Sequence, residues 1–411
     1  MNVRGFSSLW IASSLLIACT ARPPVREPRP LARPALIVVS LDGFRWDYLE
    51  RPAASTLRTM MTHGARTRRL IPAFPTKTFP NHFTLATGLL PEHHGIVANT
   101  MTDSVLGRFT TADTAGNRNP GWWSGEPIWI TARRQGLRSA TMFWVGSEVS
   151  FNGLRPNLWR PFDANLPSAA RLDQVLQWLA LPADERPDLV MLYLNRVDVM
   201  GHRYGPDHPA VDSSIAVVDS ALGRLLDGLD SLGLGDRTNL VVVSDHGMTG
   251  ISPNRVIFLD DYVPLEPGEI VDLAPVTTID PLAGRTELIL QRLSYAHPHL
   301  AVYRRAEIPI RFRFRDNSRI TPIVAIADDG WTISTRAQWA TRPLTDLGNH
   351  GYDNELASMA GILVGVGPAF RPGAVAPPLQ NIHVYALLSY LLRLHPAPND
   401  GSLDSVRALL R

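Results

Sequence analysis

Three acidic residues stand at or just after apolar, β-branched runs that are typical of buried strands. Asp42 and Asp245 each end such a run, and Asp198 follows another closely. In an open α/β sheet, the carboxyl ends of the strands line one crevice, where ligands bind. Three carboxylates directed into one crevice repel each other unless a cation lies among them. The sequence therefore predicts a metal site at this edge of a sheet.

Histidines near these acids add nitrogen ligands to the predicted site. His202 lies four residues after Asp198, a spacing that places both on one face of a helical turn. His246 follows an acidic residue at a strand end, and His350 lies in a glycine-flanked loop. The only cysteine, Cys19, is far from them in the sequence, which excludes a thiolate site. Nitrogen and oxygen ligands without sulfur suit zinc.

A candidate nucleophile, Thr78, lies between two prolines that fix a short polar stretch, Pro75 and Pro80. A threonine hydroxyl is a weak nucleophile unless it is deprotonated, which a bound zinc can promote. A helix is expected to begin near 81–83. Its free N–H groups would suit a phosphate beside Thr78.

Each of these residues also has a structural interpretation. An aspartate at a strand end often caps the next helix, and Thr78 could cap the helix near 81–83. Short patterns such as Asp-x-x-x-His and Asp-His-Gly also occur by chance, but their combination in one chain favours a metal site. The remaining histidines are assigned to surface or structural roles: His63, His82, His93, His94, His208, His297, His299, His383 and His395.

The elements that must position these residues alternate between strands and helices, which predicts an α/β doubly wound fold. The strands read as buried on both faces of a parallel sheet. They are expected at 36–41, 139–144, 188–194, 239–244 and 361–365. Helical periodicity occurs at 55–63, 126–135, 172–179, 210–232 and 385–394.

The alternation breaks between about 250 and 345, where prolines, arginines and short β-like runs at 308–314 and 323–327 occur. This segment is expected to form a small subdomain inserted beside the main sheet. The sequence shows no internal repeat.

The N-terminus has the features of an export signal. Arg4 precedes a short apolar segment, 9–18, which ends at Cys19 in a pattern that resembles the lipobox of bacterial lipoproteins. We expect a signal peptide over 1–18, a lipid on Cys19, a Pro/Arg-rich tether over 19–34, and location on the periplasmic face of the outer membrane. An ordinary cleaved signal with an unmodified cysteine is the alternative.

Composition bounds the function further. The chain has 411 residues, 45% of them hydrophobic, which suffices for a large core. The formal net charge of +2 gives no electrostatic reason to expect binding to a nucleic-acid duplex. The sequence leaves the oligomeric state open.

Five motifs in consistent order resemble the nucleotide pyrophosphatase/phosphodiesterase family of the alkaline phosphatase superfamily. The resemblance covers most of residues 35–395, so 35–411 is expected to be the catalytic domain with an alkaline-phosphatase-like sheet. The motifs are Val39-Ser-Leu-Asp-Gly-Phe-Arg45, Pro75-Thr-Lys-Thr-Phe-Pro-Asn-His82, Thr87-Gly-Leu-Leu-Pro-Glu-His-His-Gly-Ile96, Asp198-Val-Met-Gly-His-Arg-Tyr-Gly-Pro206 and Ser244-Asp-His-Gly-Met248.

The resemblance implies roles for individual residues. One zinc would be held by Asp198, His202 and His350; the other would be held by Asp42, Asp245, His246 and the hydroxyl of Thr78. Asn99 would bind a phosphoryl oxygen together with the backbone N–H of Thr78. Phe79 would stack on a nucleobase, and Phe162 would line the other side of the pocket.

The implied reaction is in-line displacement between two zinc ions about 4 Å apart. It would hydrolyse a nucleotide phosphodiester or pyrophosphate bond, pass through a phosphothreonine at Thr78 and release a nucleoside monophosphate. One departure is Asn195-Arg196-Val197 before Asp198, where many relatives have Glu-x-Pro.

Other functions on the same fold remain open. A phosphodiesterase for phospholipid or choline headgroups, or a phosphomonoesterase, would have similar metals and nucleophile. A sulfatase would need Cys-x-Pro-x-Arg or its serine counterpart, and the sequence around Cys19 does not match. A lipid-anchored binding protein on an inactive enzyme fold would lack metal, which a metal-content assay detects.

Overall fold

The structure, a computed structural model, describes residues 1–2, 35–341 and 345–411. The predicted signal peptide beyond residue 2, the lipid attachment site at Cys19 and the tether over 19–34 lie outside these ranges. Within the described ranges, no helix combines the length and the apolar character that crossing a membrane requires.

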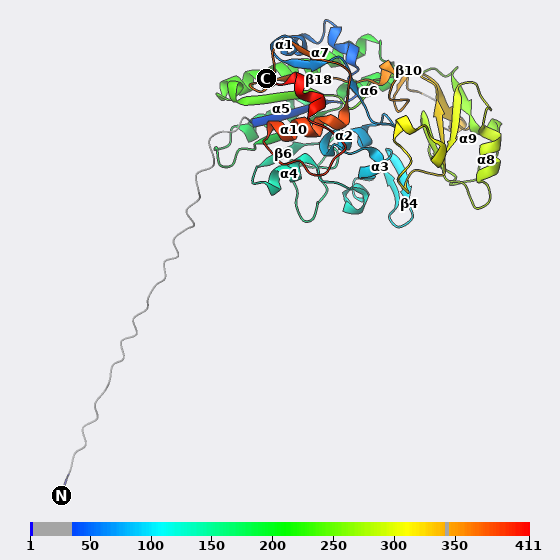
Figure 1. The fold of residues 1–411 in the computed structure, drawn as a ribbon, viewed down its shortest axis with the longest axis horizontal. Helices are drawn as coiled ribbons and strands as arrows, with labels where there is room; N and C mark the ends of the chain where they lie inside the picture. The colour runs from blue at the N-terminus through cyan, green and yellow to red at the C-terminus, as the bar shows by residue number, and fades with distance from the viewer. Residues whose placement is uncertain (3–34, 342–344) are drawn as a thin grey trace. The chain divides into compact units, whose positions relative to one another are not determined.

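An eight-stranded, mostly parallel sheet forms the centre of the catalytic part (Figure 1). Strand β1 lies between β8 and β9 and pairs with both in parallel. In sheet order the strands are β19 (Ala374–Ala376), β2 (Ala65–Thr67), β18 (Leu363–Val366), β9 (Thr238–Val243), β1 (Ala35–Leu41), β8 (Leu189–Leu194), β6 (Ser139–Met142) and β7 (Leu158–Arg160).

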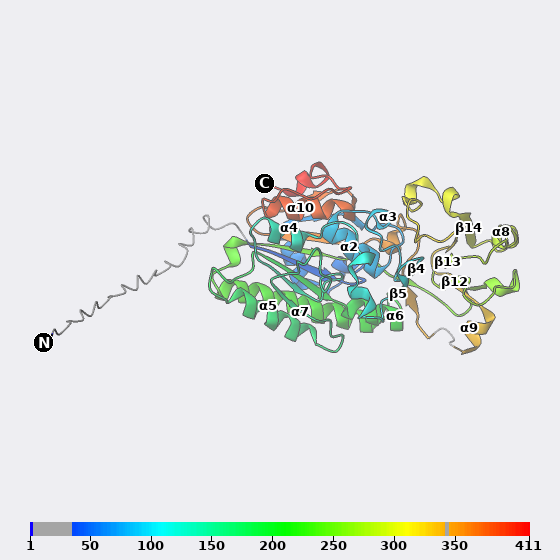
Figure 2. The ribbon, with the colours of Figure 1, turned by 90° about the horizontal axis from the view of Figure 1, so that it is seen from below.

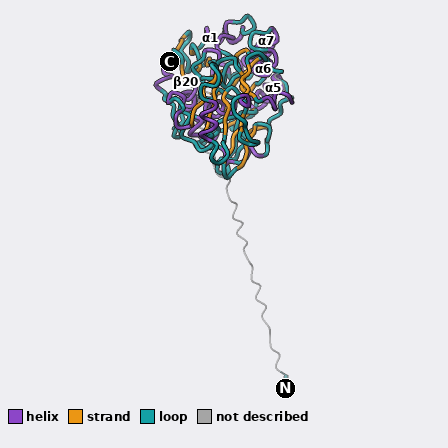
Figure 3. Tube along the Cα trace, turned by 90° about the vertical axis from the view of Figure 1, so that its right-hand side faces the viewer, coloured by secondary structure: helices purple, strands orange, loops and turns teal. Residues whose placement is uncertain are grey.

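Helices cover both faces of this sheet, as Figures 2 and 3 show. One face packs on α1 (Ser55–His63), α5 (Ser168–Leu179) and α7 (Pro209–Ser231). The other packs on α2 (Thr78–Thr87), α4 (Ile128–Arg134) and α10 (Val384–Leu391). Alternate side chains of β1 enter the two cores, because successive residues of a strand point to opposite faces. The predicted α/β doubly wound class is therefore confirmed.

One strand runs against the expected direction. The sequence predicted 361–365 as a parallel strand, but β18 is antiparallel to β9, with Leu363 opposite Val243. The chain leaves β9 at its carboxyl end, passes through the inserted segment and returns at the same end. A parallel strand would require the chain to cross first to the opposite end of the strands. Because it does not, β18 runs antiparallel to β9.

The inserted segment forms its own four-stranded antiparallel sheet (yellow, on the right of Figure 1). Its strands in order are β12 (Ile270–Asp272), β13 (Val276–Ile279), β15 (Ile323–Ala327) and β14 (Leu300–Arg304), and α8 (Thr286–Leu293) follows β13. A parallel pair, β11 (Val256–Phe258) and β16 (Thr332–Ser334), lies beside it in sequence. The predicted strand 323–327 coincides with β15.

The predicted strand at 308–314 is wrong. Residues 310–312 form a 3₁₀ turn, and Arg313 adopts a left-handed conformation with φ of 47°. Pro309 lacks an N–H to donate to a ladder, and a left-handed residue cannot continue an extended strand. Ile308, Phe312 and Phe314 of this run are buried without strand pairing, whereas Ile310 is exposed.

Shorter elements complete the described chain. The remaining helices are α3 (Pro91–His94), α6 (Arg196–Tyr204) and α9 (Arg336–Thr341). The remaining strands are β3 (Leu70–Ile71), β4 (Thr100–Asp103), β5 (Gly107–Thr110), β10 (Thr249–Gly250), β17 (Gly348–Asn349) and β20 (Leu379–Gln380).

Candidate active site

The three predicted carboxylates meet at the carboxyl ends of the central strands. Asp42 directly follows β1, Asp245 lies just beyond β9, and Asp198 lies in the first turn of α6 after β8. Gly43, at a φ of 66°, permits the close approach, because a Cβ there would lie 2.9 Å from the Cα of Asp198. None of the three aspartates is the N-cap of a helix, so the capping interpretation does not hold.

One oxygen of each carboxylate is buried without a hydrogen-bond partner among the described residues. These atoms are Oδ1 of Asp42, Oδ1 of Asp198 and Oδ2 of Asp245. A buried, unpaired carboxylate oxygen is costly, and a bound cation would satisfy it. The orphaned oxygens therefore fit a metal site.

Three histidines turn their Nε2 atoms toward these carboxylates. Because a carbonyl oxygen can only accept, each Nδ1 must be the donor: His202 Nδ1 to Gly348 O at 3.0 Å, His246 Nδ1 to Gly247 O at 2.9 Å, and His350 Nδ1 to Thr76 O at 2.8 Å. This tautomer leaves each Nε2 lone pair available for a metal, as is typical of histidine ligands.

The ligand atoms form two overlapping groups that could each hold an ion. Asp42, Asp245 and His246 make one group, and Asp198, His246 and His350 make the other, with all ligand atoms of a group within 4.8 Å of one another. His202 is outside the second group, but its Nε2 lies 3.4 Å from Asp198 Oδ1. The structure thus brings together all six side chains that the resemblance assigned to metals, with His246 between the two groups.

Thr78 lies at the first position of α2, not in a loop before a helix near 81–83 as expected. The N-cap is Lys77, so Thr78 does not cap the helix. The Thr78 hydroxyl lies 3.2 Å from His246 Nε2, at the edge of the first ligand group. Asn99 accepts the backbone N–H of Phe79 at 3.0 Å, which places its amide at the start of the same helix.

Two further residues hold the carboxylates from behind. The phenol of Tyr193 donates a short hydrogen bond to Asp42 Oδ2. His82 Nδ1 lies 3.0 Å from Thr78 O and 3.2 Å from Asp245 Oδ2, while its Nε2 lies 2.8 Å from Ser40 Oγ. Both rings are buried and pack edge to face at 5.0 Å. Tyr193 therefore fixes Asp42, and His82 fixes the start of α2 beside Asp245.

The electrostatics of the metal-free site reflect crowding of like charges. Burial, together with the charges of Asp245 and Asp198, raises the pKa of Asp42 well above its ordinary value. Burial also raises the pKa of Asp245, but the adjacent His246 and His82 outweigh it and hold that pKa well below its usual range. Burial and the neighbouring histidines His246 and His202 lower the pKa of His350. The anionic form of Asp42 is thus disfavoured while no cation is bound.

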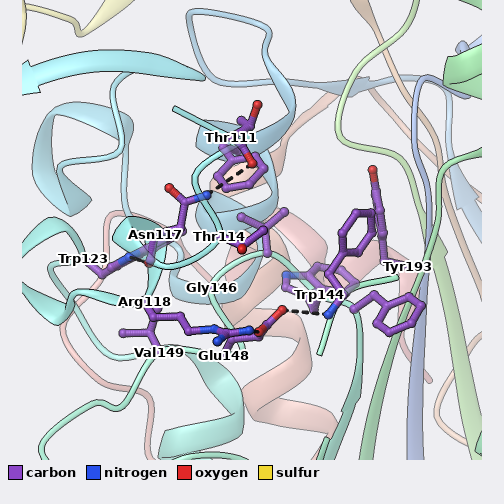
Figure 4. Close-up of a pocket in the computed structure, with 14 residues that line it drawn as sticks. Thr111, Thr114, Asn117, Arg118, Trp123, Trp144, Gly146, Glu148, Val149 and Tyr193 are labelled. Carbon is purple, nitrogen blue, oxygen red and sulfur yellow. Dashed lines mark hydrogen bonds and ion pairs between the residues drawn. The ribbon is translucent and has the colours of Figure 1, made fainter. Parts of the chain in front are cut away.

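An aromatic pocket of about 260 Å³ adjoins this cluster (Figure 4). Phe79, next to the nucleophile candidate, and Tyr193, which also bonds Asp42, belong to its lining. Phe162 lines it as well and packs against Phe143 at a centroid distance of 5.4 Å. The predicted pair Phe79 and Phe162 therefore shares one pocket.

The polar part of the pocket is organised around Glu148 (Figure 4). Its carboxylate accepts the Nε–H of Arg118 at 2.9 Å and the backbone N–H of Phe162 at 2.8 Å. Trp123 and Trp144 add large aromatic surfaces to the lining. Such a pocket, aromatic with few fixed polar groups, suits a flat heterocycle.

Sequence comparisons agree with this geometry. Residues 36–353 match the family model described as type I phosphodiesterase / nucleotide pyrophosphatase. The chain belongs to this family. Human ectonucleotide pyrophosphatase/phosphodiesterase family member 5 is 37% identical over 376 residues, 91% of this chain and 78% of the relative.

Longer family members match over the same region. Human member 1 is 37% identical over 398 residues, 93% of this chain but 42% of the relative, and rat member 3 aligns over 46% of its length. The chain thus spans about half the length of these curated relatives. A solved structure of murine member 5, inactive and in complex with AMP, covers 92% of this chain with a TM-score of 0.86 and 38% identity.

Several residues around the site are not singled out by the sequence patterns. His82 was grouped with the structural histidines, although its position four residues after Thr78 placed it on the same helix face. Tyr193 stands within an apolar strand and gave no signal of its own. Arg118, Glu148 and Trp123 lie in irregular segments, and their convergence on the pocket depends on the fold.

We predict that Asp42→Asn reduces the stabilisation against unfolding that a bound metal gives the protein. Without metal the substitution relieves carboxylate repulsion, so the chelator-treated variant should be at least as stable as the chelator-treated wild type. Saturating divalent metal should stabilise the wild type by about 3–4 kcal/mol and the variant by much less. Thermal unfolding with EDTA and with Zn²⁺, Mn²⁺ or Mg²⁺ measures both effects.

The exposed carboxylate Asp280 provides the control, because Asp280→Asn should respond to metal as the wild type does. Equal metal-induced stabilisation of wild type and Asp42→Asn would contradict a metal ligand role for Asp42.

Proposed function

We propose that this chain is a two-zinc phosphodiesterase that cleaves nucleotide phosphodiester or pyrophosphate bonds and releases a nucleoside monophosphate. The observation that supports it best is the place of Thr78. Its hydroxyl lies beside His246 in a cluster of metal-type ligands, and the next residue, Phe79, lines an aromatic pocket. The murine relative solved with AMP supports a nucleotide as ligand.

The donor set fits zinc, because it consists of imidazole nitrogens and carboxylate oxygens. We assign one ion to Asp198, His202 and His350, and the other to Asp42, Asp245, His246 and the Thr78 hydroxyl. When bound, zinc supplies Lewis acidity that favours the Thr78 alkoxide and neutralises charge on the phosphoryl oxygens.

Thr78 and Asn99 have separate roles in the proposed reaction. Thr78 Oγ1 attacks phosphorus, forms a phosphothreonine ester and expels the alcohol or phosphate leaving group. Water then attacks the ester and frees the nucleoside monophosphate. Asn99, placed at the N-terminus of α2 by its bond to Phe79 N–H, donates its amide to a nonbridging oxygen as negative charge develops.

Binding of the nucleotide falls to the pocket. We propose that Phe79 and Phe162 contact the nucleobase, because they line the same pocket and their neighbours hold them in place: Phe109 and Trp123 against Phe79, and Phe143 and Tyr193 against Phe162. A choline headgroup would use such an aromatic wall differently, through its cation. The substrate panel below separates these classes.

Thr78→Ala should abolish turnover, with a loss of at least about a thousandfold in kcat, since no other hydroxyl replaces the nucleophile. Thr78→Ser keeps a hydroxyl and should retain measurable activity. The assay compares p-nitrophenyl thymidine monophosphate, bis(p-nitrophenyl) phosphate, p-nitrophenyl phosphate and p-nitrophenyl phosphorylcholine with zinc present. A preference for the monoester or the choline ester would overturn the nucleotide assignment and leave the metal site intact.

Phe79→Ala should raise KM for p-nitrophenyl thymidine monophosphate by about tenfold, because base stacking contributes about 1–3 kcal/mol. The base-free diester bis(p-nitrophenyl) phosphate is the internal control and should change little. Phe162→Ala should act in the same direction. A uniform loss across both substrates would show that the rings pack the core and do not bind the base.

We further propose that the chain is exported and anchored through a lipid on Cys19, at the periplasmic face of the outer membrane. The support is the lipobox-like sequence that ends at Cys19. The wild type should incorporate labelled fatty acid, and Cys19→Ser should not. The Cys19→Ser variant should also be absent from the membrane fraction. Labelling of Cys19→Ser at the wild-type level would contradict the anchor.

A further inference from the structure

Lys77, the residue before the candidate nucleophile, is the only lysine in the sequence. Its side chain is 5% exposed, and its Nζ lies 2.5 Å from Asp272 Oδ2, whose side chain is 15% exposed. The same Nζ lies 3.5 Å from the Val276 carbonyl. A charge this deeply buried is stable only while it is paired.

The ion pair joins two distant parts of the chain. Lys77 is the N-cap of α2, while Asp272 ends β12 and Val276 begins β13 in the inserted sheet. The insertion is therefore attached to the nucleophile helix by a charged contact between residues 195 positions apart.

The stem of Lys77 also touches the loop that carries His350. A Cβ at Gly351 would lie 3.4 Å from the Cε of Lys77, so the stem passes directly over this glycine. Thr76, one residue earlier, accepts the Gly351 N–H at 2.9 Å and donates to the Tyr352 carbonyl at 3.1 Å. Three segments thus meet at one side chain: the start of α2, the His350 loop and the insertion.

We propose that the Lys77–Asp272 pair is a positioning device through which the inserted subdomain sets the place of Thr78 relative to the metal ligands. Neither Lys77 nor Asp272 lines the aromatic pocket or belongs to a ligand group, so the pair acts through the backbone at the start of α2. The inference rests on the proposed role of Thr78 as nucleophile. It gives the insertion a part in the reaction.

The test compares Lys77→Met and Asp272→Asn with the wild type in the purified full-length protein. Each variant should lower kcat for p-nitrophenyl thymidine monophosphate about tenfold or more, because small displacements of a reacting group are costly. KM should stay within about twofold and zinc content should be unchanged, because the pocket and the metal ligands keep their contacts.

A second buried ion pair of the insertion supplies a matched control. Glu269, three residues before Asp272, is fully buried and accepts Arg285 Nε at 2.7 Å, and the side-chain hydrogen bonds of this pair in the described residues stay within the insertion. Arg285→Met should destabilise the insertion while leaving kcat near the wild-type value. An equal loss of kcat in Arg285→Met, or none in the Lys77 and Asp272 variants, would overturn the positioning role.

The single lysine permits a readout that does not depend on turnover. An amine-acylating ester should label Lys77 slowly in the wild type and in Arg285→Met, and at least about tenfold faster in Asp272→Asn, as followed by peptide mass spectrometry. Labelling of wild-type Lys77 as fast as in urea would show that the pair does not form. A wild type without diesterase activity but with slow labelling would instead refute the proposed nucleophile, on which the positioning role rests.

Discussion

Mutual repulsion among Asp42, Asp198 and Asp245 is the constraint on which the rest of this site depends. Parallel pairing of β1 with β8 and β9 brings the strand ends together, and Gly43 lets the chain pass within contact distance of Asp198. Three carboxylates in a buried crevice cannot all be charged without a counter-charge. The fold therefore holds the carboxylates in a position where their repulsion favours binding of cations.

The surrounding contacts keep this cluster from relaxing. Backbone carbonyls fix the tautomers of three histidines, Tyr193 holds Asp42, and His82 lies against both Asp245 and the Thr78 carbonyl. Movement of Asp42, of the three histidines or of His82 would break these hydrogen bonds. Such preorganisation allows a protein to bind a metal tightly and to present a nucleophile in one orientation.

Much of this arrangement could be predicted from the sequence, because it depends on local signals. Apolar runs identified β1, β8 and β9, and the acids at their ends identified the edge where ligands meet. The six side chains that the motifs predict as metal ligands lie close together, with the Thr78 hydroxyl beside His246. The start of α2 was misplaced by about three residues, because the first turn contains Pro80 and a lysine cap that propensity alone does not reveal.

Features that depend on tertiary contacts were beyond the sequence. The direction of β18 follows from the path of the insertion, and the 3₁₀ turn at 310–312 follows from Pro309 and the left-handed Arg313. Nothing local pairs Lys77 with Asp272, or Arg118 with Glu148. Such pairs form only when segments far apart in the chain are brought together, so neither spacing nor periodicity encodes them.

The most direct test of the account is anomalous X-ray diffraction at the zinc edge from crystals of the protein grown with zinc. We predict two peaks per chain, one beside Asp42, Asp245 and His246 and one beside Asp198, His202 and His350. A well-ordered, catalytically active protein with no peak at either position would contradict the claim that cations neutralise the buried carboxylates.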